Sequence, residues 1–152
     1  TVAFADPAAV DASAVAYLAE LETVDADVES MVGSIPDGNR VLVTNHEVFG
    51  YFADRYDFEV VGTVIPSGTT VDGASAQALA ELAEIIEDKG VPAIFADTSS
   101  SDDLAQTLAD EVGSVAVVEL FSESLGEEDS DGATYLEMVR ATADRIAAAL
   151  GA

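Results

Sequence analysis

The fold that we expect for this chain follows from one stretch, Arg40-Val-Leu-Val-Thr-Asn-His46-Glu-Val-Phe-Gly-Tyr-Phe52. Its residues 41–43 form an apolar, β-branched run of the kind that makes a fully buried strand. Apolar and aromatic residues then recur at helical spacing, which predicts a helix from His46 to about Tyr56. His46 is the only histidine of the chain and stands at this junction. Because open parallel sheets bind ligands at the carboxyl ends of their strands, His46 is the first candidate for a binding residue.

Expected helices and strands alternate on either side of this stretch. Upstream, Asp6-Pro7 is a helix start, and we expect one long amphipathic helix that ends near Gly33. Downstream, strands are expected at residues 59–65, 91–96 and 115–120, and helices at 74–88, 101–113 and 134–150. A long loop, residues 66–73, would connect the second strand to its helix.

This alternation predicts an α/β fold, in which a four-stranded parallel sheet is flanked by helices and preceded by a long N-terminal helix. We expect two parts in the chain, a connecting helix at residues 1–36 and one compact α/β unit at residues 37–152. A chain of 152 residues with 49 % apolar residues is sufficient for one such core.

Charge is the strongest signal in the composition. Thirty acidic residues and five basic ones give a formal net charge of -25. Nucleic acids and anionic membranes would be repelled, so we expect neither as a partner. The charge could attract cations, or it could form a solubilising surface adapted to high salt. The acidic residues spread over every expected helix and do not cluster, which favours the solubilising surface. The N-terminus has no signal-peptide pattern, so we expect a cytosolic protein or one whose leader has been removed.

The carboxyl ends of the expected strands bring polar side chains to one edge of the sheet. They are Asn45, His46, Glu47, Ser67, Thr69, Asp97, Thr98, Ser99, Ser122, Glu123 and Ser124. An imidazole with one or two carboxylates can bind a transition metal, although a lone histidine more often caps a helix or faces solvent. The acidic loop at residues 127–131 lacks the spacing of a calcium loop. No phosphate-binding glycine loop or nucleophile elbow supports the alternative of a small α/β enzyme or nucleotide-binding domain.

Two motifs resemble those of one protein family. The stretch Thr44-Asn-His-Glu-Val-Phe-Gly-Tyr-Phe52 resembles the T-x-H-x-A-F-x-Y-F motif of the zinc/manganese solute-binding proteins of ABC transporters, often called cluster A-I. The stretch Leu120-Phe-Ser-Glu-Ser-Leu-Gly126 resembles their L-[YF]-[ST]-[DE]-S-L-G segment. Residues 75–86, 91–95, 134–138 and 146–150 also resemble the family in order. Residues 6–34 resemble the end of the long helix that joins its two lobes.

The resemblance implies an extracytoplasmic binding protein, lipid-anchored in the parent protein, that delivers metal to an ABC permease and catalyses no reaction. It implies two metal ligands in this lobe, at His46 and Glu123. Family members commonly have aspartate at the position of Glu123. Histidine at position 46 is typical of the zinc-type members and glutamate of the manganese-type ones, so we expect zinc, with manganese as the alternative. Asp97 is expected to line the edge without binding metal.

One departure from the family is large, because the N-terminal lobe with the other two ligands is missing from this sequence. We therefore expect the C-terminal lobe with its linking helix. Two ligands and water should hold zinc more weakly than four preorganised ligands. An isolated lobe with no remaining binding activity is the alternative.

Overall fold

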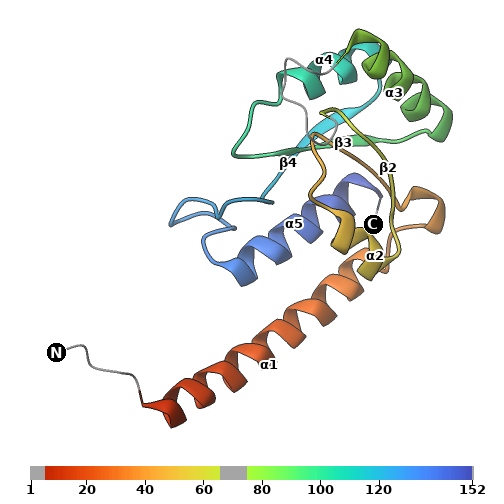
Figure 1. Ribbon diagram of the computed structural model, residues 1–152. Coiled ribbons are helices and arrows are strands. Elements are labelled where there is room, and N and C mark those ends of the chain that lie inside the picture. Colours follow the sequence, from red (N-terminus) through yellow and green to blue (C-terminus); the bar gives the residue numbers. More distant parts are fainter. Residues whose placement is uncertain (1–5, 66–74, 152) are drawn as a thin grey trace.

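The computed structural model describes residues 6–65 and 75–151, which form a parallel sheet with helices on both faces (Figure 1). The strands, in the order β2-β1-β3-β4, are β1 (Val41–Thr44), β2 (Glu59–Thr63), β3 (Ala93–Asp97) and β4 (Ala116–Leu120). The α-helices are α1 (Pro7–Val32), α2 (Gly50–Tyr56), α3 (Ala76–Lys89), α4 (Asp103–Val112) and α5 (Tyr135–Ala149), and residues Asp37–Asn39 form a 3-10 turn. The predicted α/β fold is confirmed. The loop predicted at residues 66–73 lies outside the described residues.

The strands separate two hydrophobic cores. Leu42 and Phe95 point to the face covered by α1, α2 and α5. Val43 and Ile94, their neighbours along the same strands, point to the face covered by α3 and α4. Figure 1 shows these two helix layers on opposite sides of the sheet. Because successive side chains of a strand alternate between faces, both faces must be apolar, which explains the continuous apolar run of β1.

The order of the strands creates a crevice between β1 and β3. The chain passes from β1 to β2 on one side, then returns across the sheet to form β3 on the other side of β1. The connections leave in opposite directions from the carboxyl ends of β1 and β3. This is the switch point at which open α/β sheets bind their ligands.

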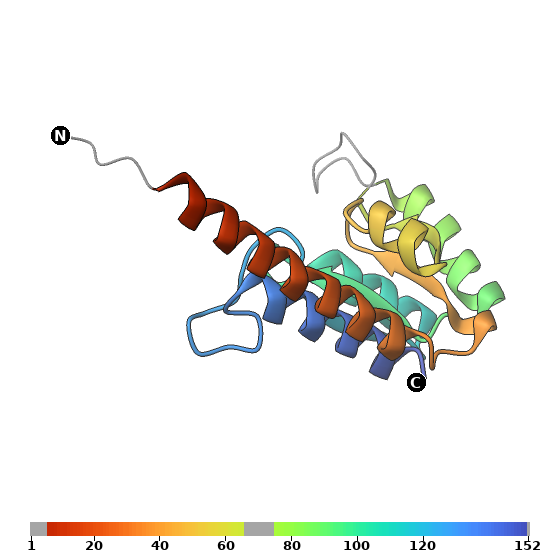
Figure 2. The same ribbon diagram turned by 90° about the horizontal axis from the view of Figure 1, so that it is seen from below.

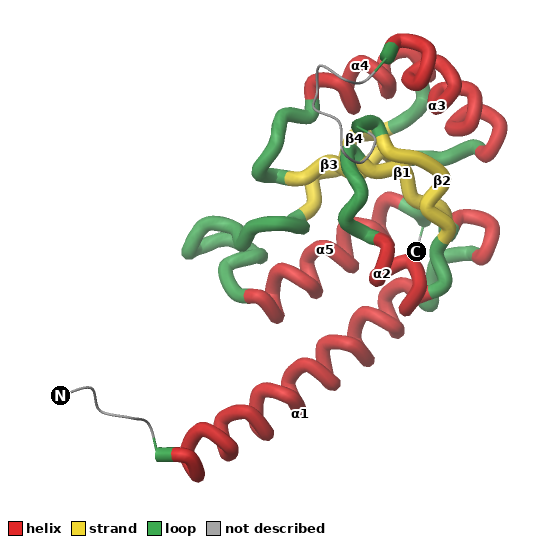
Figure 3. The backbone as a smooth tube through the Cα atoms, in the orientation of Figure 1, coloured by secondary structure: helices red, strands yellow, loops and turns green. Residues whose placement is uncertain are grey.

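Helix α1, with 26 residues, is much longer than α5, the 15-residue helix that it packs on. Its start is fixed by Asp6, whose carboxylate accepts a hydrogen bond from the amide of Ala8 at 3.2 Å, with a proline at the first helical position. Only its second half is buried, through Val24, Val28 and Val32, where it runs alongside α5 (Figure 2). The first half is exposed, although the spacing of Val10, Tyr17 and Leu18 had indicated a buried face. Val15 is also exposed. Figure 3 shows this half extending beyond the sheet.

The junction after β1 differs from the sequence prediction. Helix α2 begins at Gly50 and not at His46. The sheet continues to Asn45, whose amide donates to the carbonyl of Phe95 and whose carbonyl accepts from the amide of Ile65, both at 2.8 Å. The hydroxyl of Thr44 then donates to the carbonyl of His46 at 2.9 Å. These contacts hold His46 in a short irregular segment, so its position is set by the sheet edge.

Candidate metal centre

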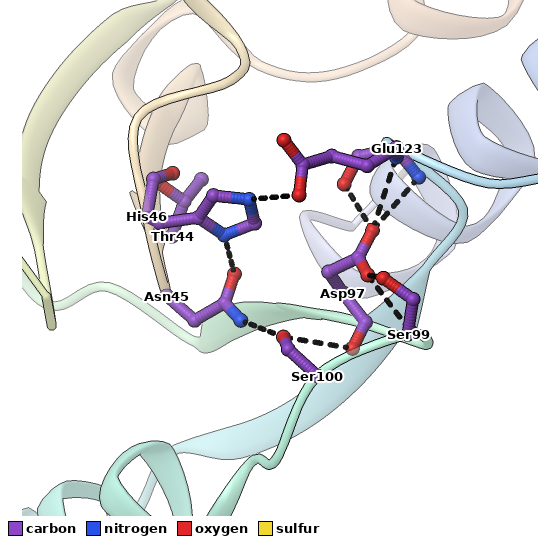
Figure 4. Close-up of polar contacts among 8 residues, drawn as sticks. Thr44, Asn45, His46, Asp97, Ser99, Ser100 and Glu123 are labelled. Carbon is purple, nitrogen blue, oxygen red and sulfur yellow. Dashed lines mark hydrogen bonds and ion pairs between the residues drawn. The ribbon is translucent and has the colours of Figure 1, made fainter. Parts of the chain in front are cut away.

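The imidazole of His46 lies between two polar side chains (Figure 4). Its Nδ1 is 2.8 Å from Oδ1 of Asn45, and its Nε2 is 3.2 Å from Oε2 of Glu123. The side chain of His46 is 25 % exposed, but its Nε2 atom is buried and makes no hydrogen bond of good geometry within the described part of the chain. The ring is therefore held on one side and faces a carboxylate on the other.

The contact between Nε2 and Glu123 requires a positive charge. Oδ1 of Asn45 can only accept, so Nδ1 of His46 carries the hydrogen and Nε2 of the neutral ring presents a lone pair. The carboxylate of Glu123 also presents lone pairs. Two such groups at 3.2 Å repel each other unless a cation lies between them or a proton on Nε2 makes an ion pair. The chemistry of this pair is that of a site for a proton or a metal ion.

Glu123 reaches the site from the loop that follows β4. Its side chain is 59 % exposed, so only its backbone is fixed. The loop is packed on the ring of Phe121, over which the guanidinium of Arg145 lies at 4.5 Å. Arg145 also pairs with Asp131 at 2.9 Å. A side chain at Gly132 would overlap the Phe121 ring, which explains the glycine at this close approach. The loop is thus anchored on α5, while the carboxylate of Glu123 keeps the freedom to approach a ligand.

Asp97, at the end of β3, is the buried carboxylate of the site. It is 2 % exposed. Its Oδ1 accepts from the amide of Ser99 at 2.7 Å, and its Oδ2 accepts from the amides of Ser122 and Glu123 at 3.1 and 3.2 Å. Both serine hydroxyls also donate to it. Burial by itself would raise the pKa of Asp97, but these hydrogen bonds outweigh burial and hold the pKa below its ordinary value of 3.8. Its lone pairs are used inside the protein, where they join the ends of β3 and β4.

The structure brings most of the predicted edge residues together. His46, Asp97 and Glu123, from the ends of three strands, form one cluster. Ser67 and Thr69 lie outside the described residues. Glu47 lines a separate surface pocket with Tyr51 and other residues near α2. Among the described residues, no group of three or more histidine or acidic side chains is placed to hold a metal ion. The described lobe therefore offers two candidate ligands.

Sequence reasoning missed the hydrogen-bond partners of this cluster. Ser100 was not among the predicted residues, yet its hydroxyl lies 2.9 Å from Nδ2 of Asn45. Asn45 was predicted to lie at the carboxyl edge of the sheet, but the sequence assigned it no function there. No sequence signal identifies these contacts, because they join the ends of different strands.

Fold and site together define a class, a doubly wound α/β unit in which an imidazole and a carboxylate face each other at the switch point. The sequence family described as ZnuA, zinc-uptake complex component A, periplasmic, matches residues 2–149. The chain belongs to this family. It is a metal-transport family and not a class of enzymes.

Individual relatives agree with this assignment. The zinc-binding protein TroA of Treponema pallidum is 39 % identical over 140 residues, which are 89 % of this chain and 45 % of TroA. The manganese-binding lipoprotein MntA of Halalkalibacterium halodurans is 25 % identical over 139 residues, 91 % of this chain and 46 % of MntA. The chain thus spans about half the length of these curated relatives.

Solved structures support the fold. The periplasmic zinc-binding protein TroA from Treponema pallidum superposes with a TM-score of 0.81 over 90 % of this chain and 50 % of that one, at 39 % identity. A Mn-bound periplasmic metal-binding protein from Candidatus Liberibacter asiaticus superposes with a TM-score of 0.77 over 92 % of this chain and 51 % of that one. At 18 % identity, the second match shows the fold alone. None of the helices that the structure describes combines the length and hydrophobicity needed to cross a membrane.

Proposed function

We propose that this chain is a metal-binding lobe of an ABC-transporter solute-binding protein, and that Nε2 of His46 and the carboxylate of Glu123 bind the transported ion. The observation that carries the proposal is the buried, unbonded Nε2 atom facing a carboxylate oxygen at 3.2 Å. A buried polar atom without a partner costs about 1–3 kcal/mol, and a metal ion would remove that cost.

The separation of the two atoms matches a bound ion. Ligand atoms at about 2.0–2.2 Å from a tetrahedral zinc ion lie about 3.3–3.5 Å from each other. The observed 3.2 Å between Nε2 and Oε2 needs only a small adjustment, which the exposed side chain of Glu123 can supply. The pair would fill two of four positions. Water, or a second lobe in a chain of the length of the relatives, would fill the others.

We propose zinc as the preferred ion, with manganese as the weaker one. Imidazole is a good ligand for zinc, whereas manganese favours carboxylate, carbonyl and water oxygens. Both metals occur among the relatives, in the names of TroA and MntA. The imidazole of this chain therefore favours the zinc-type behaviour.

The remaining parts of the proposal concern the whole protein. Residues 37–152 form the metal-binding lobe, and residues 1–36 the helix that links it to a second lobe. The protein works outside the cytoplasm, delivers its ion to an ABC permease, and binds and releases the ion without a reaction. Nucleic acids and anionic membranes are not partners, because the net charge of -25 repels both.

The test is a zinc titration of the 152-residue chain followed by NMR, in molar potassium chloride with excess magnesium to suppress loose binding by the acidic surface. We expect saturable shifts of the His46 ring and of the Glu123 amide. The shift of the Glu123 amide should disappear in His46→Ala, and zinc binding should weaken at least about tenfold in Glu123→Gln. Glu128→Gln, an exposed acid of the same loop, is the matched control and should leave binding unchanged.

Manganese added to the zinc-loaded chain should not displace zinc at equal concentration. Shifts scattered over the acidic helices, with the His46 ring silent, would refute the site and leave an isolated lobe without binding activity. Displacement of zinc by manganese would refute the metal preference alone.

A further inference from the structure

The side chain of Asn45 is buried between His46 and the loop after β3. Asn45 is 4 % exposed, and both ends of its amide group are bonded. Oδ1 is 2.8 Å from Nδ1 of His46, and Nδ2 is 2.9 Å from the hydroxyl of Ser100. Figure 4 shows these contacts as one continuous line from the imidazole to β3.

These contacts form a chain of hydrogen bonds from His46 through Asn45 and Ser100 to the backbone carbonyl of Asp97. The carbonyl of Asp97 sets the donor and acceptor of each bond in this chain. The carbonyl of Asp97 can only accept, so the hydroxyl of Ser100, 3.4 Å away, donates to it. The Ser100 oxygen then accepts from Nδ2 of Asn45. This orientation turns Oδ1 of Asn45 towards His46. Because Oδ1 can only accept, the hydrogen of the neutral imidazole is placed on Nδ1.

This order leaves the lone pair on Nε2, the atom that faces Glu123. The alternative tautomer would place its hydrogen on Nε2 and block metal binding at that atom. It would also place two hydrogen-bond acceptors, Nδ1 of His46 and Oδ1 of Asn45, at 2.8 Å from each other. The contact therefore selects a tautomer and also fixes the plane of the ring.

We propose that Asn45 is a positioning residue that holds His46 in its Nδ1–H tautomer and so makes Nε2 the metal-binding atom. The proposal rests on the proposed metal site and assigns a role within it. Outer-shell partners of metal-binding histidines orient the ring in this way, often as carboxylates. Here a neutral amide does so, and no further negative charge is added beside Glu123.

Asp97, at the carboxyl end of β3, also holds the backbone of Glu123, the second candidate ligand. The carbonyl of Asp97 begins the line to His46, and the carboxylate of Asp97 accepts from the amide of Glu123 at 3.2 Å. The two candidate ligands are thus positioned by one residue through two different groups. A change at Asn45 should disturb only the line to His46.

The experiment measures the ring nitrogens of His46 by long-range ¹H–¹⁵N NMR in the metal-free chain, at a pH where an ordinary histidine is neutral. With a single histidine in the sequence, the signals need no assignment. Without a metal, the exposed side chain of Glu123 can turn away from the ring. We therefore expect a protonated-type shift at Nδ1 and an unprotonated-type shift at Nε2. Asn45→Ala should move both shifts towards a mixture of tautomers and weaken zinc binding about 10–100-fold.

Two variants make the test specific. Asn45→Asp retains an acceptor for Nδ1–H and should restore the tautomer. Asn39→Ala is the matched control, because Asn39, the only other asparagine, donates to the carbonyl of Leu150 at 3.0 Å and lies before β1, at its opposite end. It should leave the ring shifts and zinc binding unchanged.

The outcomes separate this proposal from the proposed function. A wild-type ring with its hydrogen on Nε2, or unchanged ring shifts in Asn45→Ala, would overturn the role of Asn45 even if zinc binds. The expected tautomer without saturable zinc binding would support the role of Asn45 in orienting the ring and refute the metal site. If Asn45→Ala does not fold, the ring shifts of the wild type and of Asn45→Asp still test the proposal. A hydrogen on Nε2 in either protein would overturn the role of Asn45.

Discussion

Replacement of Asp97 by asparagine should destabilise the fold strongly while changing the size of the side chain very little. The carboxylate accepts from three backbone amides, those of Ser99, Ser122 and Glu123, and from two serine hydroxyls. An asparagine has one accepting oxygen and one donating nitrogen. At least one backbone amide must then face a donor.

The cost can be estimated from these contacts. The less costly orientation places the new NH₂ group against Ser99, so that one amide loses its acceptor, at about 1–3 kcal/mol. The amides of Ser122 and Glu123 keep an acceptor, but a neutral one, with about half the strength. The neutral side chain is easier to bury, which offsets part of this loss. We expect a net destabilisation of about 2–4 kcal/mol, a large share of the roughly 5–15 kcal/mol of a typical domain.

Urea unfolding followed by circular dichroism at neutral pH in molar potassium chloride measures this value. The midpoint should fall by roughly 1–2 M at a slope of about 2 kcal/mol per molar urea, the middle of the usual range for small proteins. Asp110→Asn, on the exposed side of α4, is the control and should stay within about 0.5 kcal/mol of the wild type. If Asp97→Asn is as stable as Asp110→Asn, the hydrogen bonds of Asp97 do not join the ends of β3 and β4 as we argue.

Two further predictions concern the ionisation of Tyr56 and the screening of the net charge by salt. Burial, together with a 2.8 Å hydrogen bond to Asp25, raises the pKa of Tyr56 to about 12. Ultraviolet absorbance should therefore show one of the four tyrosines titrating last, and this step should be absent in Tyr56→Phe. A raised pKa means that the stability contributed by Tyr56 is complete below its ordinary value of 10.0 and is lost as the pH rises through about 12, and titration of all four tyrosines near pH 10 would contradict this. The net charge of -25 predicts that the thermal midpoint rises from dilute buffer to molar potassium chloride, because the screening length falls from about 30 Å at 0.01 M to about 3 Å at 1 M. An unchanged midpoint would count against adaptation to high salt.

The prediction of the sheet succeeded because its signals are local. The apolar run of β1 and the glycines after α3 and α4 mark the ends of elements without reference to the rest of the chain. Gly90 and Gly113 indeed adopt left-handed conformations that a glycine tolerates best. The start of α2 was predicted wrongly because Phe49 and Phe52 keep helical spacing whether the helix begins at His46 or at Gly50. The sheet bonds of Asn45 decide between the two, and they involve Phe95 and Ile65, far away in the sequence.

Helix α1 shows the limit of periodicity. The same spacing of apolar residues continues from Val10 to Met31, yet only the half that reaches α5 is buried. Spacing reports which face of a helix is apolar. It does not report how far the neighbouring element extends.

The sequence by itself determined the element types and the parallel sheet. It placed His46 and Glu123 among the polar residues that follow strands, and only the family resemblance singled them out as candidate ligands. Propensity, capping and periodicity act over a few residues and can therefore be recognised in the chain. The tertiary structure alone decided the strand order, the 3.2 Å contact between those two side chains, and the line of hydrogen bonds through Asn45. These features depend on which strand ends become neighbours, and that is settled by packing two cores at once and not by any local signal.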